Sequence, residues 1–151
     1  MIPSDVWTNL VSTLKNNPTL SKYIRNVYEG FRYNIEPNSL PCLMIEPTSN
    51  NEVQKDLNQY KDIFLNLDIF AVSTADYNRA DKTIVGDTDY KGILDIENDI
   101  RACLQSSYSL GDTVLDIRFD PTTFDVGEIG KHPVRGLRMP IKVLYRQNNG
   151  A

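Results

Sequence analysis

The pattern that most constrains this chain is a regular alternation of apolar and other side chains near its C-terminal end. Between residues 137 and 145 every second residue is apolar, and the basic residues Arg138, Lys142 and Arg146 occupy the other register. Successive side chains of a strand point to opposite faces, so this period of two predicts a long β-strand over residues 135–146 with one buried face. Any fold for this chain must therefore supply a sheet with a core on one side.

Four earlier segments also have strand character. Residues 40–46 form a short, nearly continuous apolar run, which is typical of a strand buried on both faces. The other three predicted strands cover residues 26–33, 63–72 and 113–119. In the last predicted strand, residues 135–146, Pro140 lacks a backbone N–H and predicts an unpaired edge or a bulge at that point.

Two segments have the apolar spacing of amphipathic helices. Residues 3–16 place apolar side chains at steps of three and four behind a proline at the start, and residues 89–106 repeat the spacing. Residues 19–25 predict a short helical turn, and residues 47–61, 73–88 and 120–133 predict long loops. We therefore expect one α+β domain over residues 1–151. Its mixed or antiparallel sheet of about four to five strands would pack against two main helices on one face, with residues 147–151 as a frayed tail.

Composition argues against several classes of function. The net charge of −4 does not favour a protein that coats nucleic acid, which needs a positive surplus. The start of the chain lacks the basic region and apolar run of a signal peptide. Cys42 and Cys103 each lie among apolar neighbours, so we expect two small buried hydrophobic residues, as suits a reducing cytosol.

Motifs for catalysis are absent from the sequence. The single histidine, His132, lies in a predicted loop, and neither a phosphate-binding loop nor a nucleophile elbow is present. The aspartates between residues 76 and 89 lack the spacing of a calcium loop and predict a solvated acidic loop. The sequence therefore predicts a protein that is not an enzyme and that uses no metal or cofactor.

Charge is unevenly distributed along the chain. Residues 76–99 hold seven acidic and three basic side chains, whereas residues 131–146 hold five basic and no acidic ones. One interpretation is two solvated faces. The other is two complementary patches that meet between neighbouring copies and fix their orientation in a head-to-tail assembly. On the second interpretation the interface residues are Asp87, Asp89, Asp95, Asp99, Lys131, Arg135, Arg138, Lys142 and Arg146.

The order of these segments resembles a family of viral structural proteins. The N-terminal helix is followed by Leu-Pro-Cys-Leu-Met-Ile-Glu-Pro at residues 40–47 and Leu-Asn-Leu-Asp-Ile-Phe-Ala-Val at residues 65–72. A helix beginning Gly-Ile-Leu-Asp-Ile-Glu-Asn-Asp-Ile at residues 92–100 and two final strands come next. This succession resembles the tail-terminator and tail-completion proteins of long-tailed bacteriophages and related contractile systems.

The resemblance implies a homo-oligomeric ring, usually a hexamer, that is assembled in the host bacterial cytoplasm and becomes part of the virion. Such a ring caps the tail tube, stops its polymerisation and offers a surface to the head–tail connector. It meets the sheath protein where the tail is contractile, and DNA passes through its lumen only as cargo.

Two other functions stay open from the residues alone. A neck or head-closure protein would share the assembly behaviour but bind a different partner. A small nucleic-acid-binding domain would use Tyr28, Phe31, Arg32 and Tyr33 as a surface on which bases stack.

Overall fold

A single mixed sheet of six strands organises the chain. The structure is a computed structural model that describes residues 2–55, 60–75, 80–86, 91–106 and 114–148. The strand order is β1-β2-β3-β6-β4, and β5 also pairs with β6. The elements are α1 (Pro3–Asn16), η1 (Leu20–Lys22), β1 (Asn26–Glu29), η2 (Pro37–Ser39), β2 (Cys42–Lys55), β3 (Tyr60–Thr74), α2 (Ala80–Ile84), α3 (Ile93–Ser106), β4 (Asp116–Phe119), β5 (Thr123–Ile129) and β6 (His132–Asn148).

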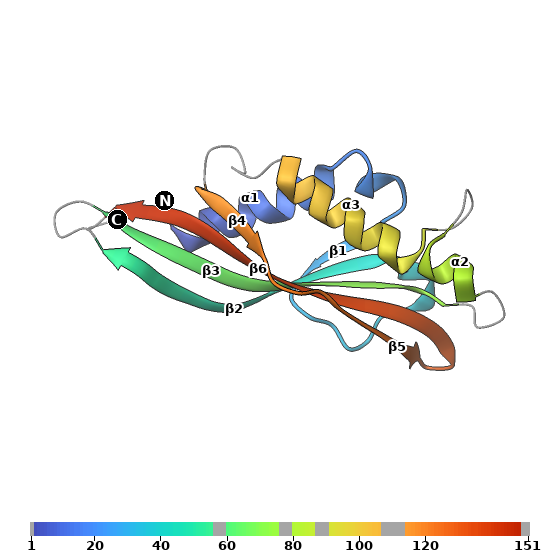
Figure 1. The fold of residues 1–151 in the computed structure, drawn as a ribbon. Helices are drawn as coiled ribbons and strands as arrows, with labels where there is room; N and C mark the ends of the chain where they lie inside the picture. The colour runs from blue at the N-terminus through green and yellow to red at the C-terminus, as the bar shows by residue number, and fades with distance from the viewer. Residues whose placement is uncertain (1, 56–59, 76–79, 87–90, 107–113, 149–151) are drawn as a thin grey trace.

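The helices α1 and α3 lie side by side on one face of this sheet, as Figure 1 shows. The predicted α+β class and the placement of the two main helices are therefore confirmed, although the sheet has six strands rather than four or five. Only β1 runs parallel to its neighbour, and the other pairings are antiparallel.

The alternation in β6 has the predicted consequence. Its residues Leu137, Met139, Ile141, Val143 and Tyr145 are buried and join the core beneath the helices. The helices contribute apolar residues spaced by three and four, because that spacing puts them on one helical face. This core also includes Val6, Leu10, Leu14, Ile96, Ile100 and Leu104. Among the described residues, none of the helices has the length and apolar character needed to cross a membrane.

Two of the predicted loops are largely strand. Residues 47–55 continue β2 and residues 60–62 begin β3, at the end of the sheet that projects beyond α1 (Figure 1). Residues 123–129 form β5, which turns into β6 at Gly130, a residue with φ of 62°. None of the side chains described in residues 47–52, 60–62 and 123–129 is buried, so these sequences do not need the apolar alternation that marks a buried strand.

Other boundaries differ by smaller amounts. The first and fourth predicted strands are shorter than expected, at Asn26–Glu29 and Asp116–Phe119. The predicted loop at residues 73–88 contains α2. Residues 147 and 148 continue β6 rather than forming part of a frayed tail, and residues 149–151 lie outside the described residues.

Pro140 marks a change of partner along one edge of β6, which confirms the predicted interruption. Residues 132–138 of β6 pair with β5, and residues 141–144 pair with β4. The Pro140 carbonyl accepts a hydrogen bond from the Asp120 N–H at 3.0 Å, in the segment that connects β4 to β5. Because proline lacks a backbone donor, continuous pairing at this edge ends where the residue stands.

The two cysteines are buried and free, as predicted. Cys103 belongs to the core under the helices, whereas Cys42 belongs to a smaller apolar cluster with Ile35, Met44 and Val134. Burial raises the pKa of each thiol to about 11, from an ordinary value of 9.0.

These thiols should react slowly with alkylating reagents in the folded protein. A rise of two pKa units lowers the thiolate fraction about a hundredfold at pH 8, and burial also blocks access. Each thiol holds its proton more tightly in the folded protein than in the unfolded chain. The resulting contribution to the free energy of unfolding is complete below pH 9 and is lost as the pH rises through 11. Labelling followed by mass spectrometry in native buffer and in urea tests this, and equal rates in the two conditions would contradict it.

Candidate functional site

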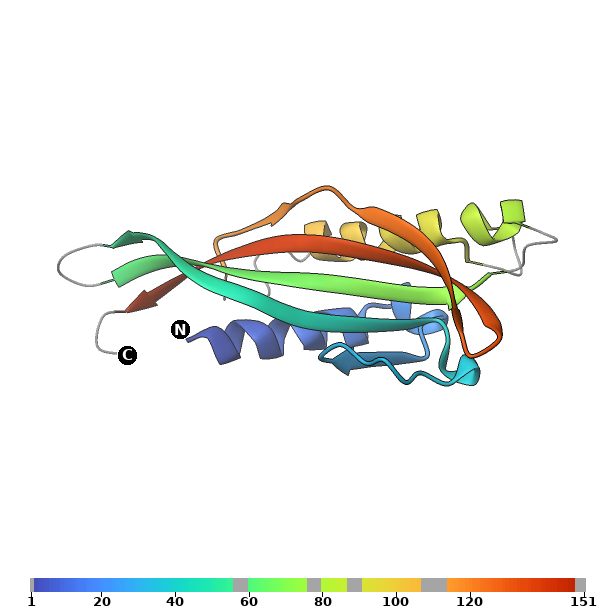
Figure 2. The same cartoon turned by 90° about the horizontal axis from the view of Figure 1, so that it is seen from below.

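The open face is our name for the side of the sheet that faces away from α1 and α3; Figure 2 views the sheet from that side. At the β5 end of this face lies a groove of about 390 Å³. Met44 from β2, Phe70 and Val72 from β3 and Val134 from β6 form its apolar floor. A hollow lined this way on an exposed sheet face is suited to receive an apolar side chain.

The first wall of the groove is the segment of residues 31–35, which follows β1. The Phe31 ring packs edge-on against Phe70, with ring centroids 4.9 Å apart, and makes a second contact of the same kind with Tyr33 at 4.9 Å. The Arg32 guanidinium lies 4.1 Å from the centroid of the Tyr28 ring. These contacts hold the wall in place, yet Tyr33 remains 88% exposed.

The second wall is β5, whose residues are nearly all exposed. The carboxylate of Asp125 lies against Gly136 of β6, where an added Cβ would come within 2.6 Å of its Oδ1 atom. Glu128 lies on the same strand, but its pairing with Pro133 turns its side chain to the helix side of the sheet, away from the groove. Among the described strands, β5 pairs only with β6, so its outer edge is open.

Two large apolar side chains on β5 are exposed as well. Phe124 is 46% exposed and Val126 is 57% exposed. The prediction from sequence missed both residues. The available signal was the short alternation of residues 123–129, which one glycine and two acidic residues obscure.

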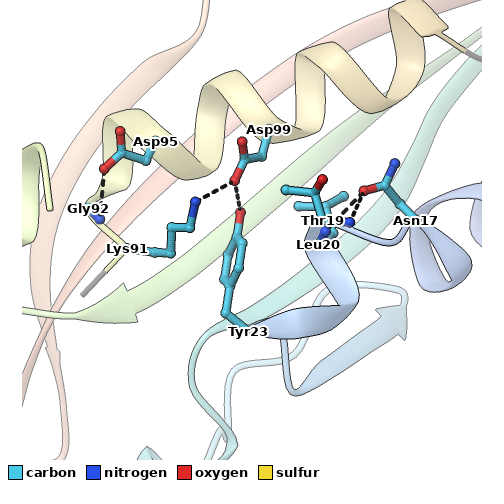
Figure 3. A network of polar contacts seen from close by, with 8 residues as sticks. All are labelled: Asn17, Thr19, Leu20, Tyr23, Lys91, Gly92, Asp95 and Asp99. Carbon is cyan, nitrogen blue, oxygen red and sulfur yellow. Dashed lines mark hydrogen bonds and ion pairs between the residues drawn. The ribbon is translucent and has the colours of Figure 1, made fainter. Parts of the chain in front are cut away.

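The predicted acidic interface residues on α3 have intramolecular roles, as Figure 3 shows. The Asp95 carboxylate accepts a hydrogen bond from the Gly92 N–H at 3.3 Å, at the start of the helix. The Asp99 carboxylate accepts one from the Tyr23 hydroxyl at 2.7 Å and another from Lys91 Nζ at 3.3 Å. Burial and then the Asp99 hydrogen bond raise the pKa of Tyr23, so its hydroxyl stays a donor. Asp87 and Asp89 lie outside the described residues.

The predicted basic residues do not form one patch. Arg138 pairs with Asp68 at 2.9 Å and Arg146 pairs with Asp62 at 2.8 Å, both on the open face. Arg135 points to the helix side, where its Nε donates to Thr83 Oγ1 of α2 at 2.9 Å. Lys131 stands in the turn before β6, and Lys142 lies beside Asn66 of β3. The cations are therefore spread along the whole strand, and their role at an interface stays a prediction.

Most arginines of the open face already form an ion pair or lie against an aromatic ring. Besides the two pairs on β6, Arg118 of β4 pairs with Asp116 at 3.1 Å and lies 5.1 Å from the Phe64 ring centroid. Arg146 also lies 3.9 Å from the Tyr60 ring centroid. A nucleic-acid backbone would have to displace these partners to bind the guanidinium groups, so the open face does not favour the nucleic-acid alternative.

Titratable groups are dispersed rather than gathered around the groove. Over the described ranges, no cluster of three or more His, Cys, Asp or Glu side chains could hold a metal ion. His132 starts β6, and its Nε2 lies 3.3 Å from Thr74 Oγ1. The chain matches no protein-family model, and no curated protein sequence matches it. The groove and the open β5 edge are therefore the features from which a function has to be inferred.

Proposed function

We propose that the protein is a structural subunit that assembles edge to edge into a ring of the tail-terminator type. The open edge of β5 carries this proposal. An unpaired edge strand presents free N–H and C=O groups to any neighbouring chain, and monomeric proteins usually protect such edges with charge, bulges or covering loops. In this protein the edge strand has two acidic residues, Asp125 and Glu128, but it also carries the exposed apolar side chains of Phe124 and Val126.

Among the described strands, the sheet has an unpaired edge strand at each end, which supports a head-to-tail arrangement. The order of the strands puts β1 at one end of the sheet and β4 with β5 at the other. Contact between unlike edges repeats from copy to copy and closes into a ring when the rotation between copies permits. Burial of Phe124 and Val126 in such a contact would remove apolar surface from water at each joint.

The sequence resemblance suggests where this ring would act. It would be a hexamer that caps the tail tube of a phage, stops the tube from growing and offers a surface to the head–tail connector. The lack of a reactive cluster in the described residues is compatible with this role but does not carry it.

Substitution of Phe124 by lysine tests the proposal. Lysine on an edge strand blocks pairing with a neighbour, so Phe124→Lys should abolish rings while circular dichroism stays that of the wild type. Leu94→Lys is the matched control, because Leu94 on α3 is exposed to a similar degree, at 44% against 46%. Negative-stain electron microscopy of each protein, alone and with the tube protein of the same particle, gives the readout.

We expect rings or capped tubes for the wild type and for Leu94→Lys, and neither for Phe124→Lys. Rings that persist with Phe124→Lys would contradict the edge contact. Co-purification with the portal-side connector and not with the tube protein would instead favour a neck protein.

A further inference from the structure

We infer that the groove on the open face is a twofold contact in which two copies each insert Tyr33 into the groove of the other. This contact is separate from the edge contact of the proposed function. It uses the inner side of β5 and the residue 31–35 wall, whereas the ring uses the outer edge of β5. Each copy therefore supplies a groove and the tyrosine side chain that fills the groove of its partner.

The shape and lining of the groove fit an aromatic ring. Its volume of about 390 Å³ is in the range of pockets that hold small organic groups. The floor presents Phe70 and Met44, and Phe31 already packs edge-on against Phe70. A second aromatic ring in the groove could add a contact of the same geometry.

Tyr33 is the side chain that one copy offers to another. It is 88% exposed at the rim of the groove, and its ring packs edge-on against Phe31 of the same copy. Tyrosine is enriched at protein interfaces, because its ring buries apolar area while its hydroxyl can remain in water.

Charge on the two walls selects a second copy as the occupant. Arg32 stands on the first wall, and Asp125 stands on the second. Over the part of the chain that the structure describes, neither of these two has an ion-pair partner, unlike Arg118, Arg138 and Arg146. Across a twofold axis residue i meets residue j and j meets i. The basic wall of each copy then faces the acidic wall of the other, and both sets of pairs form together.

Sedimentation velocity of the Phe124→Lys protein tests this inference apart from ring formation. With the edge contact blocked, we expect a concentration-dependent dimer. Tyr33→Ser in the same background should raise the dimer dissociation constant about tenfold or more, as truncation of a buried interface aromatic does. Tyr60→Ser is the matched control, since Tyr60 lies at the far end of β3 from the groove, and it should leave the dissociation constant unchanged.

Charge reversal adds a readout that misfolding cannot imitate. Arg32→Glu alone and Asp125→Arg alone should each weaken the dimer, and the two together should restore it. A Phe124→Lys protein that is monomeric at every concentration would overturn the twofold contact, as would a charge-swapped Arg32→Glu, Asp125→Arg protein whose dimer does not recover. Either result leaves the ring proposal standing. Absence of rings in the wild type beside an intact dimer would refute the ring alone.

Discussion

Leu104→Ala should lower the free energy of unfolding by about 2–5 kcal/mol. Leu104 is fully buried on the face of α3 that packs against the sheet. Its truncation removes apolar surface from the core and leaves a cavity that the long, well-paired strands beneath it cannot readily fill. Urea denaturation followed by circular dichroism, at concentrations low enough to prevent assembly, measures the loss.

The same helix provides the control. Leu94→Ala is the same chemical change on α3, but Leu94 is 44% exposed. We expect a change within about 0.5 kcal/mol for this variant, because substitutions at exposed sites away from special features are nearly neutral. Equal losses for the two variants would mean that α3 does not pack on the sheet through the face described.

The helices and the buried strands could be predicted because burial leaves a periodic mark. Predicted residues 3–16 match α1 at both ends, where Pro3 begins the helix and Pro18 follows its end. The alternation over residues 135–146 identified the buried face of β6 correctly. In each case the core demands apolar side chains at fixed spacing, so a single sequence carries the signal.

The uncovered parts of the sheet have no such periodic pattern of apolar residues in the sequence. The outer half of β2 and nearly all of β5 are strands because their backbones pair with β3 and β6, not because their side chains need a core. Pairing of that kind depends on long-range contacts, which local patterns do not report. For this reason the groove, with β5 as one wall, could not be predicted, although the sequence does suggest Tyr28, Phe31, Arg32 and Tyr33 as a surface on which bases stack.

The runs of charge do not point to the groove, for a different reason. The runs of acidic and basic residues are real, but a sequence does not show which charges already have partners. Asp68 and Asp62 on β3 pair with Arg138 and Arg146, and Asp99 is held by Tyr23 and Lys91. Among the described residues, Arg32 and Asp125 lie beside the groove without an ion-pair partner, and both lie outside those runs.

Gly92→Ala should lower the free energy of unfolding by about 1–3 kcal/mol, as overpacking of a tight site does. Gly92 precedes α3 and passes so close to the end of α2 that an added Cβ would overlap the backbone carbonyl group of Ile84. A backbone group cannot swing aside as a side chain can, so α2 or the start of α3 has to move. That movement would also disturb the Gly92 N–H to Asp95 hydrogen bond at the helix start.

Gly127→Ala separates this steric effect from the general effect of replacing glycine. A Cβ at residue 127 would meet nothing within 4 Å, so this variant should unfold at nearly the same urea concentration as the wild type. Denaturation midpoints of both variants, measured side by side, give the comparison. If Gly92→Ala were as stable as Gly127→Ala, α2 would have to shift from Gly92 at no cost. The packing of α2 against the start of α3 would then contribute little to the stability of this end of the molecule.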